Sequence, residues 1–200
     1  RDRSPSRGLG DVYKRQIKGW SETMLLTGTD IDQGTFKKGM TIILKESGRL
    51  TSIVEELLDI SRIQSGRMKL MTEKIDLVAE LDEAVYMLKE RSIQERKHLM
   101  FDSPIEPFPP VMGDKNRLRQ VFLNIIDNAL KYTPEGGNVI VQILNKETNI
   151  EVLISDTGCG IAPEDLPKVK DKFYKANQNV GGSGIGLAVA DEIVQMHGGT

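Results

Sequence analysis

The sequence has few cysteine, histidine and aromatic residues, and it contains no long apolar run. Its 200 residues include one cysteine, two histidines and one tryptophan. One thiol cannot form an internal disulfide, and one cysteine with two histidines is too few for a four-ligand Cys/His zinc site. No stretch approaches the ~18 apolar residues that a membrane-spanning helix needs. We therefore expect this part of the protein to be cytoplasmic, with any membrane anchor lying upstream of it.

No charge of one sign predominates. The chain carries 27 basic and 29 acidic residues, so its formal net charge is −2. A protein that neutralises phosphates along a nucleic acid needs a marked basic excess, so nucleic acid is not an expected partner. With 200 residues and 38% hydrophobic composition, the chain is long enough for one ordinary core and a smaller helical part.

The first third of the chain is predicted to be helical after a leader without pattern. Residues 1–16 are basic and lack apolar periodicity, so we expect them to be disordered or foreign, such as a cloning or assembly artefact. Apolar residues then recur at helical spacing: Ile17, Trp20 and Met24 in one segment, and Phe36, Ile43, Leu50 and Leu57 in the next. Two helices bury little surface alone, so we expect residues 17–66 to form a four-helix bundle with a second copy. One amphipathic helix lying on its own domain is the alternative.

Residues 67–200 alternate between strand and helix signals. The predicted helices are 78–95, 115–132 and 186–196, and the predicted strands are 68–77, 98–101, 139–144 and 150–155. Asp114 suits the N-cap of helix 115–132, and Gly198 suits the end of the last helix. The pattern indicates an α+β domain.

Helix 115–132 has a polar stripe opposite its apolar face. Arg117, Asn124, Asn128 and Lys131 recur at spacings of seven, four and three. Carboxamide oxygens are hard ligands suited to Mg²⁺, and a lysine one turn away can meet a phosphate. The stripe therefore indicates a metal–triphosphate site, and a solvated polar face is the alternative.

Two glycine-rich segments add to this candidate site. Asp156 follows a predicted strand and precedes Gly158 and Gly160, so its carboxylate can accept an exocyclic amine while the backbone passes close beneath a flat ring. Residues 181–186 open the last helix, where successive glycine N–H groups bind anions. The segment is neither a P-loop nor a GxGxxG motif, which disfavours those two nucleotide-binding classes.

The order of these elements resembles the ATP-binding domain of histidine kinases, in the ATPase family that also contains Hsp90 chaperones, MutL and type II topoisomerases. Residues 123–133 resemble its N box, 156–160 its G1 box, 182–187 its G2 box and 173–175 the second part of its F box. Residues 46–62 resemble the second helix of the kinase dimerisation and phosphotransfer domain, which argues against a chaperone-like or repair ATPase. The resemblance implies an α+β protein whose ATP-binding domain is a two-layer α/β sandwich of the Bergerat type.

The resemblance also implies roles for individual residues. Asn124 and Asn128 would serve Mg²⁺, Lys131 the phosphates, Tyr132 the flank of the nucleotide, and Asp156 the adenine amine. The ATP site would be completed by Gly158, Gly160, Ile161, Gly182, Gly184, Gly186 and Leu187, with the G2 glycines facing the phosphates. Lys175 stands where the family usually has an arginine that reaches the γ-phosphate.

Departures from the family pattern limit what this chain is expected to do. The phosphoacceptor position falls on Gly8, and Tyr13 stands where a proline is expected, so the phosphoacceptor histidine is missing and autophosphorylation is not expected. Lys170 replaces the first phenylalanine of the F box. We also expect the ATP-binding domain to lack its last strands. His98 and His197 are interpreted as structural, His197 as an imidazolium that complements a helix dipole.

Together these observations predict the catalytic part of a sensor histidine kinase of a two-component system. The complete protein is expected to be a homodimer that transfers the γ-phosphoryl of Mg²⁺·ATP to a histidine and then to an aspartate of a response regulator. The alternative is a dimeric ATP-sensing module, or a degenerate kinase, that holds ATP without transfer. A histidine followed by an acidic residue, with proline five residues after the histidine, upstream of Ile17 in the gene would favour the kinase.

Overall fold

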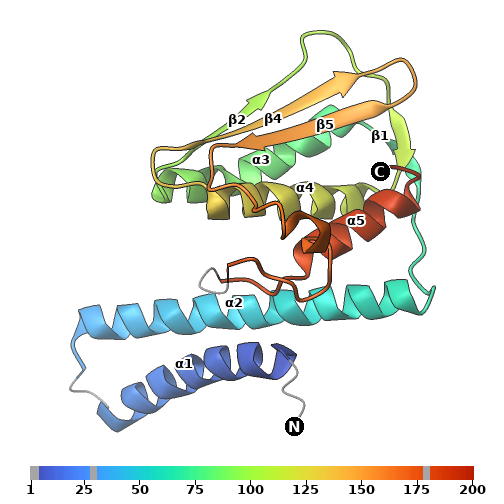
Figure 1. The fold of residues 1–200 in the computed structure, drawn as a ribbon. Helices are drawn as coiled ribbons and strands as arrows, with labels where there is room; N and C mark the ends of the chain where they lie inside the picture. Colours follow the sequence, from blue (N-terminus) through green and yellow to red (C-terminus); the bar gives the residue numbers. More distant parts are fainter. Residues whose placement is uncertain (1–4, 28–30, 178–180) are drawn as a thin grey trace. The chain divides into compact units, whose positions relative to one another are not determined.

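The chain divides into two compact units, drawn in Figure 1. A computed structural model describes residues 5–27, 31–177 and 181–200. One unit comprises Arg1–Gln64 and the other Ser65–Thr200. Within the described ranges, no helix is both long and apolar enough to span a membrane.

The first unit is a helical hairpin of α1 (Pro5–Thr27) and α2 (Gln33–Gln64). A Cβ at Gly39 of α2 would be 2.7 Å from the ring of Trp20 in α1, so the glycine permits close packing of the two helices. Large apolar side chains remain exposed along both helices: Leu25, Leu26, Phe36, Met40, Leu44, Val54, Leu57 and Leu58. The hairpin thus leaves much apolar surface uncovered within one chain.

Residues 5–16 form the first half of α1, so the expectation of a disordered leader is wrong there. Pro5 opens the helix, where its fixed φ is favourable and its missing N–H is not needed. Tyr13 is buried, and the Arg49 guanidinium of α2 lies 5.8 Å from the centroid of its ring. Packing of this kind stabilises a helix that the apolar periodicity did not indicate. The foreign origin of residues 1–16 stays a prediction.

The second unit contains a three-stranded sheet. Its strands are β2 (His98–Asp102), β4 (Asn138–Asn145) and β5 (Ile150–Asp156), in the order β2–β4–β5. β2 is parallel to β4, with Leu99 opposite Val139, and β4 is antiparallel to β5, with Val141 opposite Ile154. The predicted hairpin of β4 and β5 is therefore confirmed.

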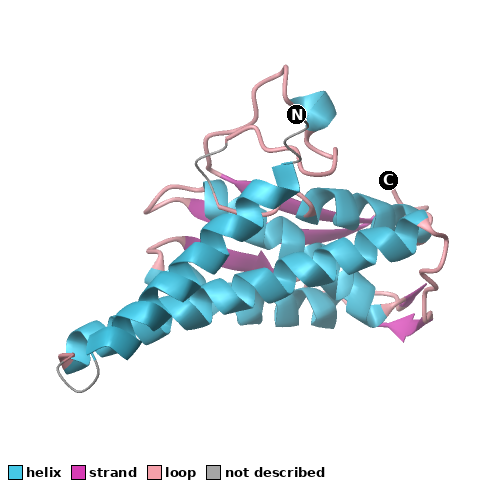
Figure 2. Ribbon diagram, turned by 90° about the horizontal axis from the view of Figure 1, so that it is seen from below, coloured by secondary structure: helices cyan, strands magenta, loops and turns pink. Residues whose placement is uncertain are grey.

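Helices cover one face of this sheet, which gives the unit two layers (Figures 1 and 2). They are α3 (Leu77–Gln94), α4 (Lys115–Tyr132) and α5 (Gly186–Met196). Side chains from both layers are less than 2% exposed and form the core: Leu81, Leu99, Ile126, Leu130, Val139, Val141, Ile185, Val189 and Ile193. Along β4, buried residues alternate with half-buried ones, as expected for a strand with one covered face.

A separate two-stranded sheet joins β1 (Glu73–Ile75) to β3 (Val111–Gly113), with Lys74 opposite Met112. β1 lies inside the predicted strand region 68–77. β3 was not predicted, because three residues are too few to show the alternation that marks a strand.

Asp114 joins three parts of the second unit. Its Oδ1 accepts the N–H groups of Asn116 and Arg117, each at 3.1 Å, which makes it the predicted N-cap of α4. Its Oδ2 accepts the N–H of Met71 at 2.9 Å, and its own N–H donates to Nε2 of His197 at 2.9 Å. Burial alone would raise the pKa of Asp114, but the N–H groups that its carboxylate accepts outweigh burial and lower the pKa.

His197 is a neutral acceptor rather than the expected imidazolium. Its Nε2 accepts the N–H of Asp114, and its Nδ1 lies 2.8 Å from the carbonyl oxygen of Ile193. A ring nitrogen that accepts a hydrogen bond carries no proton, so this arrangement fits the tautomer protonated on Nδ1. His197 thus links the end of α5 to the start of α4. Gly198 follows it with a φ of +76°, as predicted for the C-terminal cap.

Candidate nucleotide-binding site

Three segments meet beside α4: the polar stripe of that helix, the loop after β5 and the loop before α5. Nδ2 of Asn124 donates to the carbonyl oxygen of Gly186 at 3.1 Å. A Cβ at Gly186 would be 3.6 Å from Cγ of Asn124, so the first residue of α5 lies against α4. Because Nδ2 is already used, the side-chain oxygen of Asn124 is the atom available to a ligand.

Lys131 reaches from the end of α4 to the loop before α5. A Cβ at Gly182 would be 2.6 Å from Nζ of Lys131, and Gly182 has a φ of +133°. The ammonium therefore occupies the space that a side chain at this position would need. The same Nζ lies 5.1 Å from the ring centroid of Tyr132. Burial raises the pKa of Tyr132, with a smaller contribution from Cys159, so its phenol is neutral near pH 7.

The loop after β5 places Asp156 and Gly158 against the end of α4. Oδ1 of Asp156 accepts the N–H of Gly158 at 2.8 Å. Asp156 is exposed, so its second carboxylate oxygen can accept a proton donor of a ligand. A Cβ at Gly158 would be 2.8 Å from the carbonyl oxygen of Tyr132, and Gly160 has a φ of +69°. The path of this loop therefore requires glycine at both positions.

Residues 164–177, which we name the lid segment, lie between the two glycine loops in sequence and contain the short helix η2 (Leu166–Lys168). The N–H of Phe173 donates to the carbonyl oxygen of Gly184 at 2.8 Å. A Cβ at Gly184 would be 3.1 Å from Cγ of Lys175. Lys175 therefore lies beside the same loop that Lys131 reaches.

The structure brings most of the predicted residues into contact in pairs: Asn124 with Gly186, Lys131 with Gly182, Tyr132 with Gly158, and Lys175 with Gly184. Asn128 is half-buried one turn after Asn124, and its carboxamide makes no hydrogen bond to any described residue. Ile161 is exposed next to Gly160, and Leu187 is half-buried in the first turn of α5. The roles of these residues in binding stay predictions.

Charged contacts that support α4 were not predicted. Glu80 of α3 is buried, and its Oε2 lies 2.6 Å from Nη2 of Arg119 in α4. Arg91 of α3 is paired with Asp127 of α4. The two partners of each pair are at least 36 residues apart, so no local pattern could have indicated them. These pairs hold α3 against the helix that carries Asn124.

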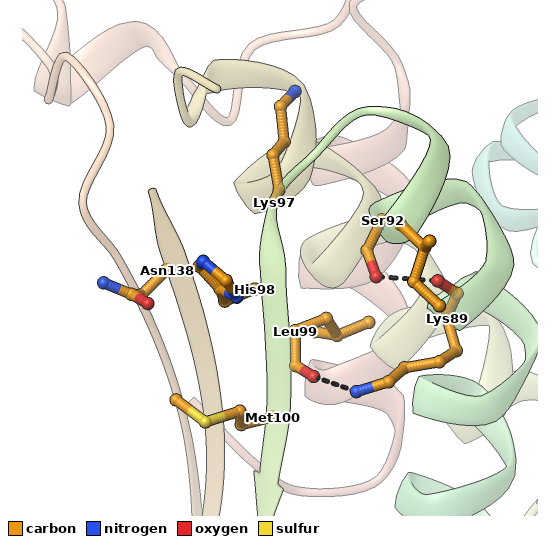
Figure 3. A pocket seen from close by; sticks show the side chains of 8 residues that line it. Lys89, Ser92, Lys97, His98, Leu99, Met100 and Asn138 are labelled. Atoms are coloured by element: carbon orange, nitrogen blue, oxygen red, sulfur yellow. Dashed lines mark hydrogen bonds between the residues drawn. The ribbon is translucent and has the colours of Figure 1, made fainter. Parts of the chain in front are cut away.

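A cavity of about 350 Å³ lies beside β2 and is lined by none of the predicted site residues (Figure 3). It is lined by Lys89, Ser92, Ile93, Lys97, His98, Leu99, Met100 and Asn138. Several of its polar groups already have protein partners. Lys89 donates to the carbonyl oxygen of Leu99 at 2.6 Å, Ser92 to that of Lys89 at 2.7 Å, and Lys97 to that of Leu130 at 2.7 Å. These contacts are structural, so we keep the glycine loops, and not this cavity, as the candidate site.

Comparison with known proteins identifies the family. Residues 113–200 match the family model described as histidine kinase-, DNA gyrase B- and HSP90-like ATPase. The sensor-like histidine kinase SenX3 of Mycobacterium tuberculosis is 32% identical over 181 residues, which is 88% of this chain and 43% of that protein. The chain belongs to the sensor histidine kinase family. The non-motile and phage-resistance protein of Caulobacter vibrioides is 33% identical over 197 residues, which is 92% of this histidine kinase chain and 23% of that protein. The chain thus spans less than half the length of these relatives.

Solved structures, among them the histidine kinases AdeS and ThkA, share the fold. AdeS of Acinetobacter baumannii has a TM-score of 0.67 and 25% identity, covering 92% of this chain and 83% of that chain. Full-length ShkA in complex with AMPPNP has a TM-score of 0.71 and 21% identity, covering 97% of this chain and 41% of that chain. ThkA in complex with the response regulator TrrA has a TM-score of 0.70 and 21% identity, covering 97% of this chain and 55% of that chain. The expected fold, helices followed by an α/β ATPase domain, is confirmed.

Proposed function

We propose that the second unit of this histidine kinase binds Mg²⁺·ATP, and that the complete protein transfers the γ-phosphoryl to a histidine and then to an aspartate of a response regulator. One observation carries the proposal. The helix α4, which carries Asn124, Asn128 and Lys131, is contacted both by the loop after β5 and by the loop before α5, and the motifs stand in the order that the family uses. The AMPPNP bound to ShkA, a structure that shares this fold, supports the choice of nucleotide.

We place the adenine end of the proposed site at the loop after β5. The free oxygen of Asp156 accepts the exocyclic amine of adenine, because its other oxygen is held by Gly158. The absence of a side chain at Gly158 and Gly160 lets the base lie close to the backbone. Tyr132 lies next to this loop and flanks the nucleotide.

The phosphate end lies between α4 and the loop before α5. Lys131 brings its ammonium group to this loop, and the side chain of Lys175 runs beside it. The N-terminus of α5 adds backbone N–H groups and a positive dipole end. The donor set fits Mg²⁺, since the side-chain oxygens of Asn124 and Asn128 are hard ligands without another partner among the described residues. When bound, the metal neutralises part of the phosphate charge.

Phosphoryl transfer then depends on placement and charge neutralisation. Neither histidine of this chain stands at the site, since His98 is exposed on β2 and His197 accepts the N–H of Asp114. The phosphoacceptor, with an acidic residue beside it as general base, belongs to the complete protein. We therefore do not expect the present chain to phosphorylate itself. A degenerate kinase or an ATP-sensing module remains the second candidate, favoured by Gly8 at the phosphoacceptor position.

The domain roles and partners follow from the same proposal. Residues 17–66 form the dimerisation and phosphotransfer hairpin, and 67–200 form the ATP-binding domain. The exposed apolar residues of α1 and α2 support a homodimer with a four-helix bundle. The complex of ThkA with TrrA supports a response regulator as the second partner. We place the catalytic part in the cytoplasm, with a membrane anchor in the complete protein.

Nucleotide binding tests the proposal directly. Titration of the purified chain with a fluorescent ATP analogue, with and without Mg²⁺, measures affinity in Asn128→Ala, Asp156→Ala and the unchanged protein. Each substitution removes a contact to a charged or strongly polar group, so we expect affinity to fall about ten- to a hundredfold. Asn145→Ala is the control, because Asn145 pairs with Ile150 at one end of the β4–β5 hairpin and Asp156 lies at the other end, opposite Val139. Magnesium-independent binding, or equal affinity in all variants, would exclude the proposed site.

A further inference from the structure

The lid segment is attached to α5 by an ion pair at the position where the family pattern has a phenylalanine. Nζ of Lys170 lies 2.5 Å from Oδ1 of Asp191 in α5. The other oxygen of Asp191 accepts Nε2 of Gln195 at 2.9 Å. The Asp191 side chain is 20% exposed and that of Lys170 is 63% exposed, so the carboxylate is the less exposed partner of the pair.

Two further contacts fix the residues that follow Lys170. Nζ of Lys172 lies 3.8 Å from Oε1 of Glu192, the next residue of α5. The N–H of Phe173 donates to the carbonyl oxygen of Gly184 in the loop before α5. Residues 170–173 of the lid segment therefore contact α5 and the loop before it, two residues ahead of Lys175.

We propose that Lys170 and Asp191 are positioning residues for the nucleotide site, whose ion pair docks the lid segment on α5 and thereby sets Lys175 beside the phosphate-binding loop. This inference rests on the proposed function. An aromatic contact at this position would be insensitive to ionic strength, whereas a surface ion pair is screened by salt. Lid docking, and with it ATP affinity, is therefore salt-dependent in this chain.

The size of the effect is bounded by the exposure of the pair. Measured exposed ion pairs change an equilibrium by up to about fivefold. The hydrogen bond from Gln195 already restricts the Asp191 side chain, so forming the ion pair costs less side-chain entropy. We therefore expect an effect of about two- to fivefold in lid docking at low salt.

Lid docking is measured first without nucleotide, by hydrogen exchange of residues 164–177 in the full chain. Lys170→Met and Asp191→Asn remove one charge each, and we expect lid exchange to quicken by about two- to fivefold at low salt. Lys170→Arg keeps the charge, and the double variant Lys170→Asp/Asp191→Lys restores the pair with reversed signs, so both should return exchange towards the original rate. Lys146→Met is the matched control, because it removes an exposed lysine that pairs with Glu151 in the hairpin.

Affinity for a non-hydrolysable ATP analogue is then compared at low and high salt. We expect Lys170→Met to lower the affinity by the same factor by which it quickens lid exchange. In this variant the affinity should also depend less on salt, because the ion pair that salt screens is gone. The inference is overturned if lid exchange is unchanged in Lys170→Met and Asp191→Asn, if Lys146→Met has the same effect, or if the reversed pair fails to restore docking. It is also overturned if the lid loosens while affinity stays constant. If the unchanged protein does not bind the analogue, the proposed function fails, and exchange still decides whether the ion pair docks the lid.

Discussion

Replacing Asp114 by alanine should destabilise the second unit more than removal of an ordinary helix cap. Asp76 caps α3 in the same way that Asp114 caps α4, through two N–H groups bound to Oδ1. Asp114 makes one further bond, from the N–H of Met71 to Oδ2. The two variants Asp114→Ala and Asp76→Ala therefore differ by that bond and by burial, since Asp114 is buried and Asp76 is exposed, and Asp76→Ala is the control for loss of the cap alone.

The magnitude follows from this difference. Loss of a cap costs about 1 kcal/mol, and we expect that value for Asp76→Ala. Leaving the Met71 N–H without its partner costs a further 1–3 kcal/mol or so. Met71 is 83% exposed, so water can replace part of the lost bond and the lower part of the range applies. We expect Asp114→Ala to lower the free energy of unfolding by about 2–3 kcal/mol.

Native-state hydrogen exchange gives this free energy for the second unit alone. The amides in the middle of α4, around the fully buried Ile126 and Leu130, exchange through opening of that unit. Fluorescence of Trp20, the one tryptophan of the chain, reports on the first unit and should not change. Equal costs for Asp114→Ala and Asp76→Ala would refute the reasoning.

The cost should also depend on pH. The pKa of Asp114 is lowered in the folded protein, so its contribution is complete above the unfolded value of about 3.9. The contribution is lost as pH falls from there through the folded-state pKa, because the protonated carboxyl accepts these bonds poorly. The difference between Asp114→Ala and the unchanged protein should therefore shrink below about pH 4. A difference that stays constant to lower pH would contradict the role of the carboxylate.

Two further predictions concern the core and the lid segment. Leu130→Ala should lower the free energy of unfolding by about 3 kcal/mol, because Leu130 is fully buried. Leu144→Ala is the control: this residue is 36% exposed, so its replacement should cost under about 1 kcal/mol in the same exchange measurement. Equal costs would contradict the assigned core. Tyr174 donates to Asp165 at 2.5 Å, which raises the pKa of its phenol, so alkaline absorbance titration should show a late-ionising tyrosine that Tyr174→Phe removes and Asp165→Asn shifts down. The hydrogen bond is intact below the unfolded pKa of about 10 and is lost above the raised value, and an unchanged titration in both variants would exclude it.

The elements with strong local signals were predicted well from the sequence. α4 and α5 have the predicted bounds, because Asp114 caps one and Gly198 ends the other. α3 begins and ends within one residue of its prediction. The first half of α1 and the short β3 were missed, because the former is stabilised by packing of Tyr13 and the latter is too short to show a pattern.

The site shows the same division between local and distant information. The order of the motifs indicated the candidate residues, but nothing local indicated that Nδ2 of Asn124 is bound to Gly186. The sequence likewise raised doubt about Lys170 without indicating Asp191, which lies 21 residues away on α5. His197 was predicted to be charged because its helix end favours a cation, whereas its distant partner Asp114 requires an acceptor.

The bond between Asp114 and His197 has a mechanical consequence. It pins the first turn of α4 to the last turn of α5, at the ends of those helices farthest from Lys131 and Gly182. Because a helix behaves as a stiff rod, we expect a tilt of α5 against α4 to move the glycine loop more than it moves this corner, and the bond between Asn124 and Gly186 opposes such a tilt.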